Sequence, residues 1–139
     1  MERRDYLEDQ IKQLAQVLAS MIGFIKGKKN ANFESAAEAV DRALQAELDL
    51  DIESLTGLSD EHFIAKLAAT NKFNSDNFER LANVLFILAK TSGADANNLK
   101  VNKLYSKSLL LYKYIESNDK NYSLHRNSRM REIQQAISM

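Results

Sequence analysis

The sequence predicts an all-α protein of about six helices that pair as antiparallel hairpins. The first observation is composition, because the 139 residues include 0 Pro and only 4 Gly, and both residue types disrupt helices. The second is periodicity, because apolar side chains recur every three or four residues, the spacing of one helix face. The chain length predicts one domain spanning residues 1–139.

The first two predicted helices form a hairpin. The first spans about residues 5–25, and residues 26–30 end it with lysines that suit the negative end of the helix dipole. The second begins near Asn32, whose side chain can accept hydrogen bonds from first-turn N–H groups. The apolar stripe of the first helix contains Leu7, Ile11, Leu14, Leu18, Met21 and Ile25, and that of the second contains Phe33, Ala36, Ala37, Val40, Ala43, Leu44 and Leu48.

Residues 47–58 alternate acidic and apolar side chains after the second helix. Asp49, Asp51 and Glu53 have the spacing that opens a calcium-binding loop, but Ser54 stands where such a loop needs its turn glycine. We therefore interpret this segment as a solvated linker.

The third and fourth helices have clear boundaries. Ser59 is the expected N-cap of the third helix, which ends near Asn71. The fourth follows residues 75–76, and Gly93 is expected just after its end. Residues 81–89 are apolar almost all round, which is typical of a helix buried on several sides. We expect the fourth helix at the centre of the fold.

The last two helices differ in polarity. The fifth spans about residues 99–116 and carries an apolar stripe that includes Tyr105 and Tyr112. The sixth begins near Tyr122 and is more polar, as expected of a terminal helix with one dry face. The sixth-helix stripe consists of Met130, Ile133 and Ile137.

Two stretches of the chain resemble the tetratricopeptide repeat (TPR), a helical hairpin motif. In residues 32–44 an aromatic residue starts the helix, and two alanines seven residues apart let a partner helix approach closely. Residues 85–89 resemble the large-x-x-large-small signature of a first helix, and residues 101–109 then resemble a second helix. The whole-chain layout resembles an uncharacterised bacterial family of TPR-like proteins. The positions that carry the resemblance are Phe33, Ala36, Ala43, Leu44, Leu85, Leu88, Ala89, Val101, Tyr105, Ser108 and Leu109.

This resemblance implies a TPR-like right-handed stack and a non-catalytic role in protein or peptide binding. Carried over by repeat position, a groove lined by first helices would include Lys12 and Gln16 on the first predicted helix, with Asn83 and Lys90 on the fourth. Amide side chains can hydrogen-bond a peptide backbone, and lysines can meet a carboxylate. The alternative reading of these four residues is an ordinary solvated face. The identity of the partner does not follow from the sequence.

Catalytic motifs are missing from the sequence. The chain has 0 Cys, and neither His62 nor His125 has another histidine three or four residues away to form a helical metal pair. No phosphate-binding glycine loop, nucleophile elbow or zinc-protease motif occurs. We predict a protein that is not an enzyme, with no catalytic residues, cofactor or metal ion.

Charge is distributed unevenly although the net charge is zero. Residues 1–30 sum to +2, residues 31–93 to −6 and residues 94–139 to +4. The alternative function is therefore a nucleic-acid-associated accessory protein that uses the basic C-terminal helices. We favour a solvated face for these residues, because the chain as a whole is not basic. The basic set consists of Lys100, Lys103, Lys107, Lys113, Lys120, Arg126, Arg129 and Arg131.

The remaining predictions concern the cellular location and the oligomeric state of the protein. No apolar run approaches the roughly 18 residues of a membrane span, and the charged start differs from a secretory signal peptide. We therefore predict a cytoplasmic protein that does not insert into membranes. A homo-oligomer is also possible, because a short helical stack leaves apolar ends.

Overall fold

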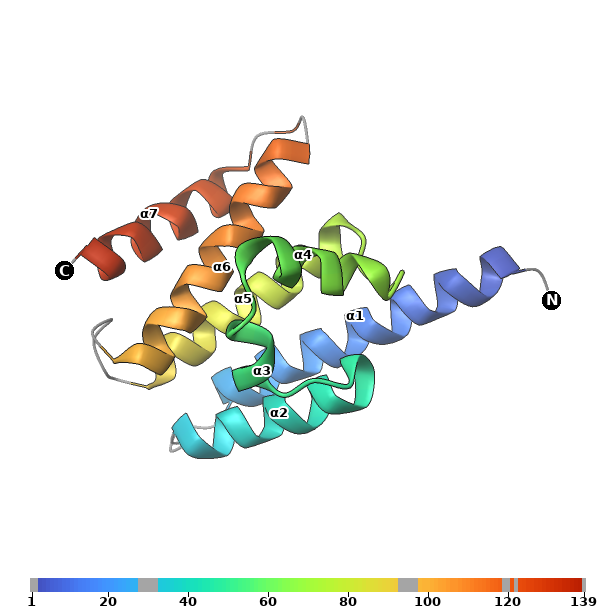
Figure 1. Ribbon diagram of the computed structural model, residues 1–139, viewed down its shortest axis with the longest axis horizontal. Coiled ribbons are helices and arrows are strands. Elements are labelled where there is room, and N and C mark those ends of the chain that lie inside the picture. The colour runs from blue at the N-terminus through green and yellow to red at the C-terminus, as the bar shows by residue number, and fades with distance from the viewer. Residues whose placement is uncertain (1–2, 28–32, 93–97, 119–120, 122, 139) are drawn as a thin grey trace.

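The computed structural model describes residues 3–27, 33–92, 98–118, 121 and 123–138. Within these ranges 88% of residues are helical and no strand occurs, so the predicted all-α class is confirmed. The described residues form seven helices rather than about six (Figure 1). The helices are α1 (Arg3–Gly27), α2 (Phe33–Leu48), α3 (Ile52–Thr56), α4 (Asp60–Ala69), α5 (Ser75–Thr91), α6 (Leu99–Asn118) and α7 (Leu124–Ser138).

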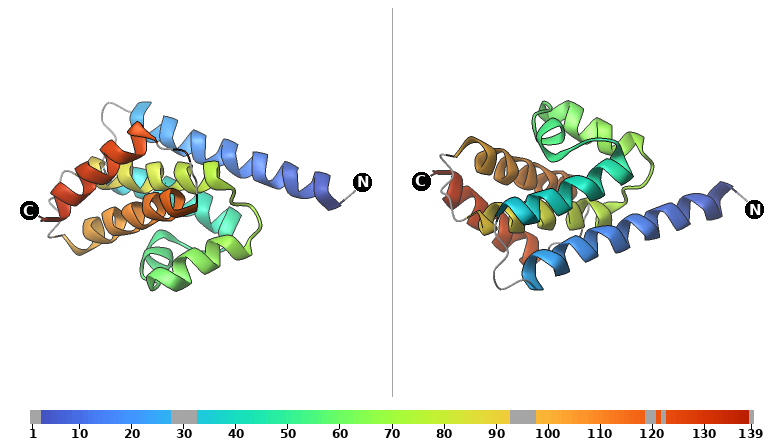
Figure 2. Two further views of the ribbon diagram at one scale, coloured as in Figure 1. Left: turned by 90° about the horizontal axis from the view of Figure 1, so that it is seen from above. Right: turned by 90° about the horizontal axis from the view of Figure 1, so that it is seen from below.

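Helix α1 packs against α5 and α2 along its C-terminal part, while its N-terminal part extends beyond the rest of the molecule (Figures 1 and 2). This placement explains the burial along its predicted stripe. Leu7 and Ile11 are half-buried near the extended end. The positions that pack on the body, namely Leu14, Leu18, Met21 and Ile25, are all buried.

The additional helix is α3, which lies in the segment that the sequence analysis interpreted as a solvated linker. Asp51 is its N-cap, and one carboxylate oxygen accepts a hydrogen bond of 2.7 Å from the Ser54 N–H. Asp41 of α2 accepts another, also 2.7 Å long, from the Ile52 N–H. These carboxylates satisfy free N–H groups of the first turn, and Leu55 is fully buried beneath them. The linker interpretation was therefore wrong for residues 52–56.

Helix α4 begins where the sequence predicts. Ser59 is its N-cap and accepts a hydrogen bond from the His62 N–H. Phe63 is fully buried one turn later. The helix ends at Ala69, and Asn71 just beyond it has a φ of 61°, the left-handed conformation that often stops a helix.

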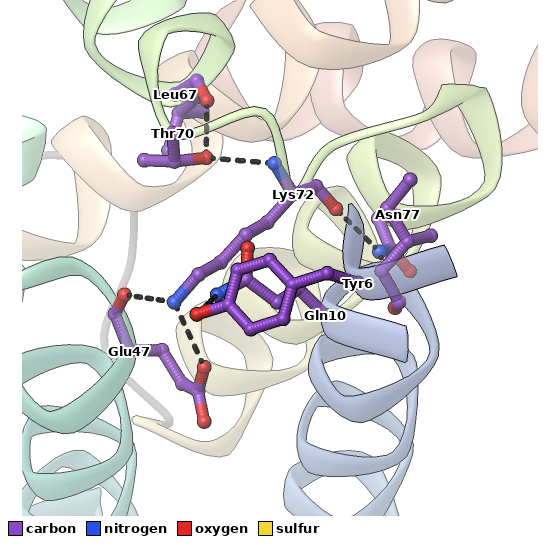
Figure 3. Close-up of polar contacts among 8 residues, drawn as sticks. Tyr6, Gln10, Glu47, Leu67, Thr70, Lys72 and Asn77 are labelled. Atoms are coloured by element: carbon purple, nitrogen blue, oxygen red, sulfur yellow. Dashed lines mark hydrogen bonds and ion pairs between the residues drawn. The ribbon is translucent and has the colours of Figure 1, made fainter. Parts of the chain in front are cut away.

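The connection between α4 and α5 joins three elements, as Figure 3 shows. Lys72 Nζ donates to the backbone carbonyl of Glu47, 3.1 Å away, near the C-terminus of α2. The Glu47 carboxylate lies 3.4 Å from the same ammonium. Asn77 is fully buried, and its Nδ2 donates to the carbonyls of Lys72 (2.8 Å) and Ile11 (3.0 Å). The two side chains therefore hold α1, α2 and α5 in one arrangement.

Helix α5 lies at the centre of the fold, as predicted. It packs against α6 over most of its length and also against α1. Leu85, Leu88 and Ala89 are each at most 1% exposed. Ser108 of α6 is also fully buried at the crossing, where its hydroxyl donates 2.8 Å to the carbonyl of Ala82. The N-cap is Asn74, directly before the residues expected to precede the helix.

Helix α7 packs on α6 and begins at Leu124, two residues after the predicted start. Of its predicted stripe, Ile133 is fully buried, and Met130 and Ile137 are half-buried. Asn32, Gly93 and Tyr122, which the sequence analysis named at helix boundaries, lie outside the described residues.

Candidate functional site

The four residues predicted to line a groove lie in different surroundings. Lys12 and Gln16 are exposed on α1. Gln16 borders a wide hollow of about 520 Å³ between α1 and α2, together with Val17 and Ala43. The two α5 residues lie elsewhere, toward α6 and α7, so the structure does not bring the four side chains around one hollow.

The α5 residues already have partners inside the chain. Asn83 is half-buried, and its side-chain oxygen accepts a hydrogen bond from the Tyr112 hydroxyl of α6. Lys90 is exposed, and its ammonium lies 2.8 Å from a carboxylate oxygen of Glu132 on α7. Sequence reasoning did not foresee that α7 packs beside this face of α5.

A shallow hollow of about 350 Å³ lies where the C-terminal end of α1 meets α5 and α7. Its apolar lining comes from Ile25, Phe86 and Ile87. Three cationic side chains border it, one from each helix: Lys26 of α1, Lys90 of α5 and Arg129 of α7. The remaining lining residue is Thr91, whose hydroxyl donates 2.8 Å to the carbonyl of Ile87.

Phe86 lines this hollow and contacts two of its three cations. The guanidinium carbon of Arg129 lies 4.2 Å from its ring centroid, and Lys90 Nζ lies 5.5 Å from it. Tyr105 approaches the same ring edge-on, with centroids 6.1 Å apart at 67°. Cations over an aromatic face are stabilised by about 0.5–1 kcal/mol at exposed sites. The ring therefore fixes both cations at the border of the hollow.

The hollow is electrically positive. Glu132 compensates one of the three cations through its ion pair with Lys90. The Arg129 guanidinium has no hydrogen-bond acceptor within the described part of the chain. Arginine carries five donors arranged in a fork that matches carboxylates. Two positive charges and free donors thus remain for an external anion.

The two buried tyrosines on α6 contribute neutral hydroxyls. Burial raises the pKa of Tyr112, and the nearby Arg129 charge only partly offsets that effect. Burial likewise raises the pKa of Tyr105. Both side chains stay protonated near neutral pH, so the Tyr112 hydroxyl acts as a hydrogen-bond donor to Asn83.

Arg126 fixes α7 beside this hollow. Its guanidinium donates to Glu116 of α6 at 2.8 Å, to Glu79 of α5 at 3.0 Å and to the carbonyl of Asn121 at 2.8 Å. Burial lowers the pKa of Arg126, but the hydrogen bonds and charges of Glu116 and Glu79 outweigh that effect and raise it. Arg126 is therefore a charged residue at the contact between α5, α6 and α7.

The interpretation of the basic C-terminal set as a solvated face was wrong for two of its members, whereas Lys100, Lys113 and Arg131 are exposed. Arg126 and Lys107 are each only 7% exposed. Lys107 Nζ lies 2.9 Å from the Asp60 carboxylate of α4 and 5.4 Å from the Phe63 ring centroid. Lys120 lies outside the described residues. Nucleic-acid binding by the remaining basic residues stays a prediction.

The histidines lie apart from this hollow. His62 Nδ1 lies 3.0 Å from the Ser59 hydroxyl, but this contact belongs to the N-cap of α4, and both residues are exposed. His125 is also exposed, on α7. Among the described residues, no group of three histidine, aspartate or glutamate side chains is placed to hold a metal ion.

Comparisons with known proteins identify no relative of this chain. Neither the protein-family models, nor the curated proteins, nor the solved structures give a match to this chain. No helix in the described ranges combines the length and the apolar character needed to cross a membrane.

Proposed function

We propose that this chain is a non-catalytic helical module that binds a short segment of a partner protein in the hollow between α1, α5 and α7. The observation that carries the proposal is the arrangement of Lys26, Lys90 and Arg129 around the apolar lining beside Phe86. Such a border of cations around an apolar surface offers both anchoring area and charge complementarity.

We also propose a TPR-like right-handed stack for the helices. In this reading α1 and α2 form one hairpin, α5 and α6 form the next, and α7 begins a third. The packing of α1 against both α2 and α5, and of α5 against α6, supports the reading. Helices α3 and α4 would then be an insertion between the hairpins. The hollow is bordered by the first helix of each unit.

The partner segment that fits this hollow carries a large apolar side chain next to one or two acidic residues. The apolar group would lie against Ile25 and Ile87, and a carboxylate would accept from Arg129. The hollow is small, so we expect a weak, transient interaction with a dissociation constant on the order of 10–100 μM. Binding should weaken as salt rises.

Lys12 and Gln16 stay predicted peptide contacts on α1, at a distance from this hollow in the fold. A longer partner segment could extend along α1 and reach them. Substituting Lys12 by Gln should then weaken a long ligand about twofold and leave a short one unchanged. Equal affinities for a long ligand would remove Lys12 from the site.

The test is selection of peptides from a random library on the immobilised protein, followed by fluorescence anisotropy with the enriched sequences. We expect enrichment of acidic residues beside Leu, Phe or Trp. Arg129→Gln should weaken binding about 5–10-fold, and Lys26→Gln about 2–3-fold. Lys66→Gln and Lys113→Gln are the matched controls, because both lysines are exposed on other helices, and each should stay within twofold of the parent.

Two outcomes would contradict the proposal. One is enrichment without any acidic preference, and the other is an equal loss of affinity in the two control variants. The melting temperature of each variant must be measured alongside, since Arg129 also packs on Phe86. A variant with the parental melting temperature and reduced affinity reports on binding alone.

A further inference from the structure

A more enclosed hollow of about 220 Å³ lies between α2, α3, α5 and the start of α6, so α5 is the one helix that it shares with the proposed peptide site. Leu88 and Leu104 line it and are at most 2% exposed, whereas Leu99 is 68% exposed and marks its rim. Further apolar lining comes from Phe33, Ala37 and Ile52. Its volume is below the roughly 300–1,000 Å³ of sites for drug-sized molecules, so only a small molecule fits.

Two of the polar side chains in its wall form hydrogen bonds within the chain. Asp41 Oδ1 accepts from the Ile52 N–H at 2.7 Å. Thr56 Oγ1 donates to the Ile52 carbonyl at 2.8 Å. Apart from its charged side chains, the lining of the hollow is therefore mainly apolar, and the Thr56 hydroxyl and the Ile52 N–H already have partners. Such a surface gains more from an apolar group than from water.

Charges of opposite sign stand on different walls of this hollow. Asp41 of α2 and Glu53 of α3 supply carboxylates, and Lys100 and Lys103 of α6 supply ammonium groups. Within the described part of the chain, neither lysine forms an ion pair. A ligand that carries both a carboxylate and an ammonium group can thus meet both walls.

We propose that this hollow binds a small zwitterion with an apolar body, of the class of free apolar α-amino acids. The apolar side chain lies against Leu88 and Leu104. The carboxylate meets Lys100 and Lys103, and the ammonium group meets Asp41 or Glu53. A solely anionic or cationic molecule of the same size satisfies one wall and leaves its own charge facing a like charge on the other. The proposal does not depend on the peptide site.

Binding can be measured by saturation-transfer NMR and chemical-shift titration on the full chain. The probes are L-leucine, L-leucinamide, which lacks the carboxylate, and N-acetyl-L-leucine, which lacks the ammonium group. We expect a dissociation constant on the order of 0.1–1 mM for L-leucine. Each capped analogue should bind at least tenfold more weakly.

Substitutions in the lining test whether the ligand binds in this hollow. Ala37→Phe fills the hollow and should abolish binding, and Ala37→Leu provides a milder filling if the larger side chain prevents folding. Lys103→Gln should weaken L-leucine about 3–10-fold. Lys113→Gln, exposed farther along α6, is the control and should stay within twofold.

Three results would overturn the inference. N-acetyl-L-leucine binding as tightly as L-leucine would mean that the site selects anions. No binding of any probe at 10 mM, a ceiling roughly tenfold above the weakest expected dissociation constant, would mean that the hollow is only a packing gap. Unchanged affinity in both Ala37 variants would place the ligand elsewhere on the chain.

Discussion

Replacing Arg126 by Met should detach α7 from the helices beneath it. The residue is 7% exposed, and its guanidinium holds two carboxylates and one backbone carbonyl. Methionine keeps an apolar body of similar length but offers no donors. Glu79 and Glu116 then remain at the junction without their shared cation, which makes the substitution a test of charge rather than of volume.

The expected loss of folding free energy depends on how far Arg126, Glu79 and Glu116 are buried. Removing one member of a buried ion pair typically costs about 3–5 kcal/mol. The side chains of Glu79 and Glu116 are 32% and 30% exposed, so water can rehydrate both carboxylates after the change. We therefore expect about 2–3 kcal/mol, which corresponds to a melting temperature lower by roughly 8–12 °C in a chain of this size.

The assay is urea unfolding followed by circular dichroism, with hydrogen exchange to locate the effect. Arg131→Met is the matched control, because Arg131 is exposed on the same helix, and it should cost less than about 0.5 kcal/mol. Adding Glu79→Gln to Arg126→Met should cost less than the sum of the two single changes, by about 1–2 kcal/mol. Exchange should accelerate first in α7.

If Arg126→Met costs no more than Arg131→Met, or the cycle with Glu79 gives additive costs, then the ion pairs do not hold α7. Its attachment would then depend on Ile133 and the apolar contacts around that residue.

Three further predictions concern single positions. Gly23→Ala should stabilise α1 by about 0.5–1 kcal/mol, because an added Cβ meets nothing within 4 Å. Gly57→Ala should destabilise the protein, because its Cβ would lie 3.0 Å from the Glu53 carbonyl oxygen. Urea unfolding of the two variants tests both expectations. Ser108→Ala should destabilise the protein by about 1 kcal/mol through the lost hydrogen bond, and Ser108→Leu should destabilise it more, because the larger side chain overpacks the α5–α6 crossing. Thermal melts that show equal losses of stability for the two variants would contradict this. The hydrogen bond from the Ser54 N–H lowers the pKa of Asp51 below its ordinary value of 3.8. The ionised Asp51 carboxylate therefore stabilises the folded protein above pH 3.8, and this stabilisation is lost as the pH falls through the lowered pKa. Thermal melts from pH 5 to pH 2 should therefore show the advantage of the parent over Asp51→Asn shrinking below about pH 4, and a constant difference would refute this.

The helical core was predictable because its signal is repetitive and local. The spacing of apolar residues in 81–89 already indicates burial on several sides, and Leu85 and Leu88 are fully buried. Helix α3 was missed for the converse reason. Its five residues are too few for a period to show, and Asp51 was weighed as a calcium ligand rather than as an N-cap. An Asp three residues before Ser54 was the local signal that could have found it.

The candidate site was less predictable, because it depends on which distant segments meet. Lys90 was named from the repeat pattern, but Arg129 and Lys26 were not named with it, since they come from α7 and α1. Nothing in a helical period shows that Arg129 packs on Phe86, 43 residues earlier in the printed chain. Sequence patterns specify which face of a helix is apolar, whereas the neighbour of that face follows from the tertiary packing.

The uneven charge of the chain can now be divided into an internal and an external part. An acidic middle segment and a basic C-terminal segment can pair with each other inside the fold or with a charged partner outside it. Lys107 with Asp60, and Arg126 with Glu79, join the two segments, so packing accounts for part of the asymmetry. The internal part fixes the fold. The cations that remain unpaired within the described residues include Arg129, Lys100 and Lys103, and each of them borders a hollow with apolar lining. A charge that has no internal partner and stands beside an apolar surface is where an external ligand gains most, which is why both proposed sites lie at these residues.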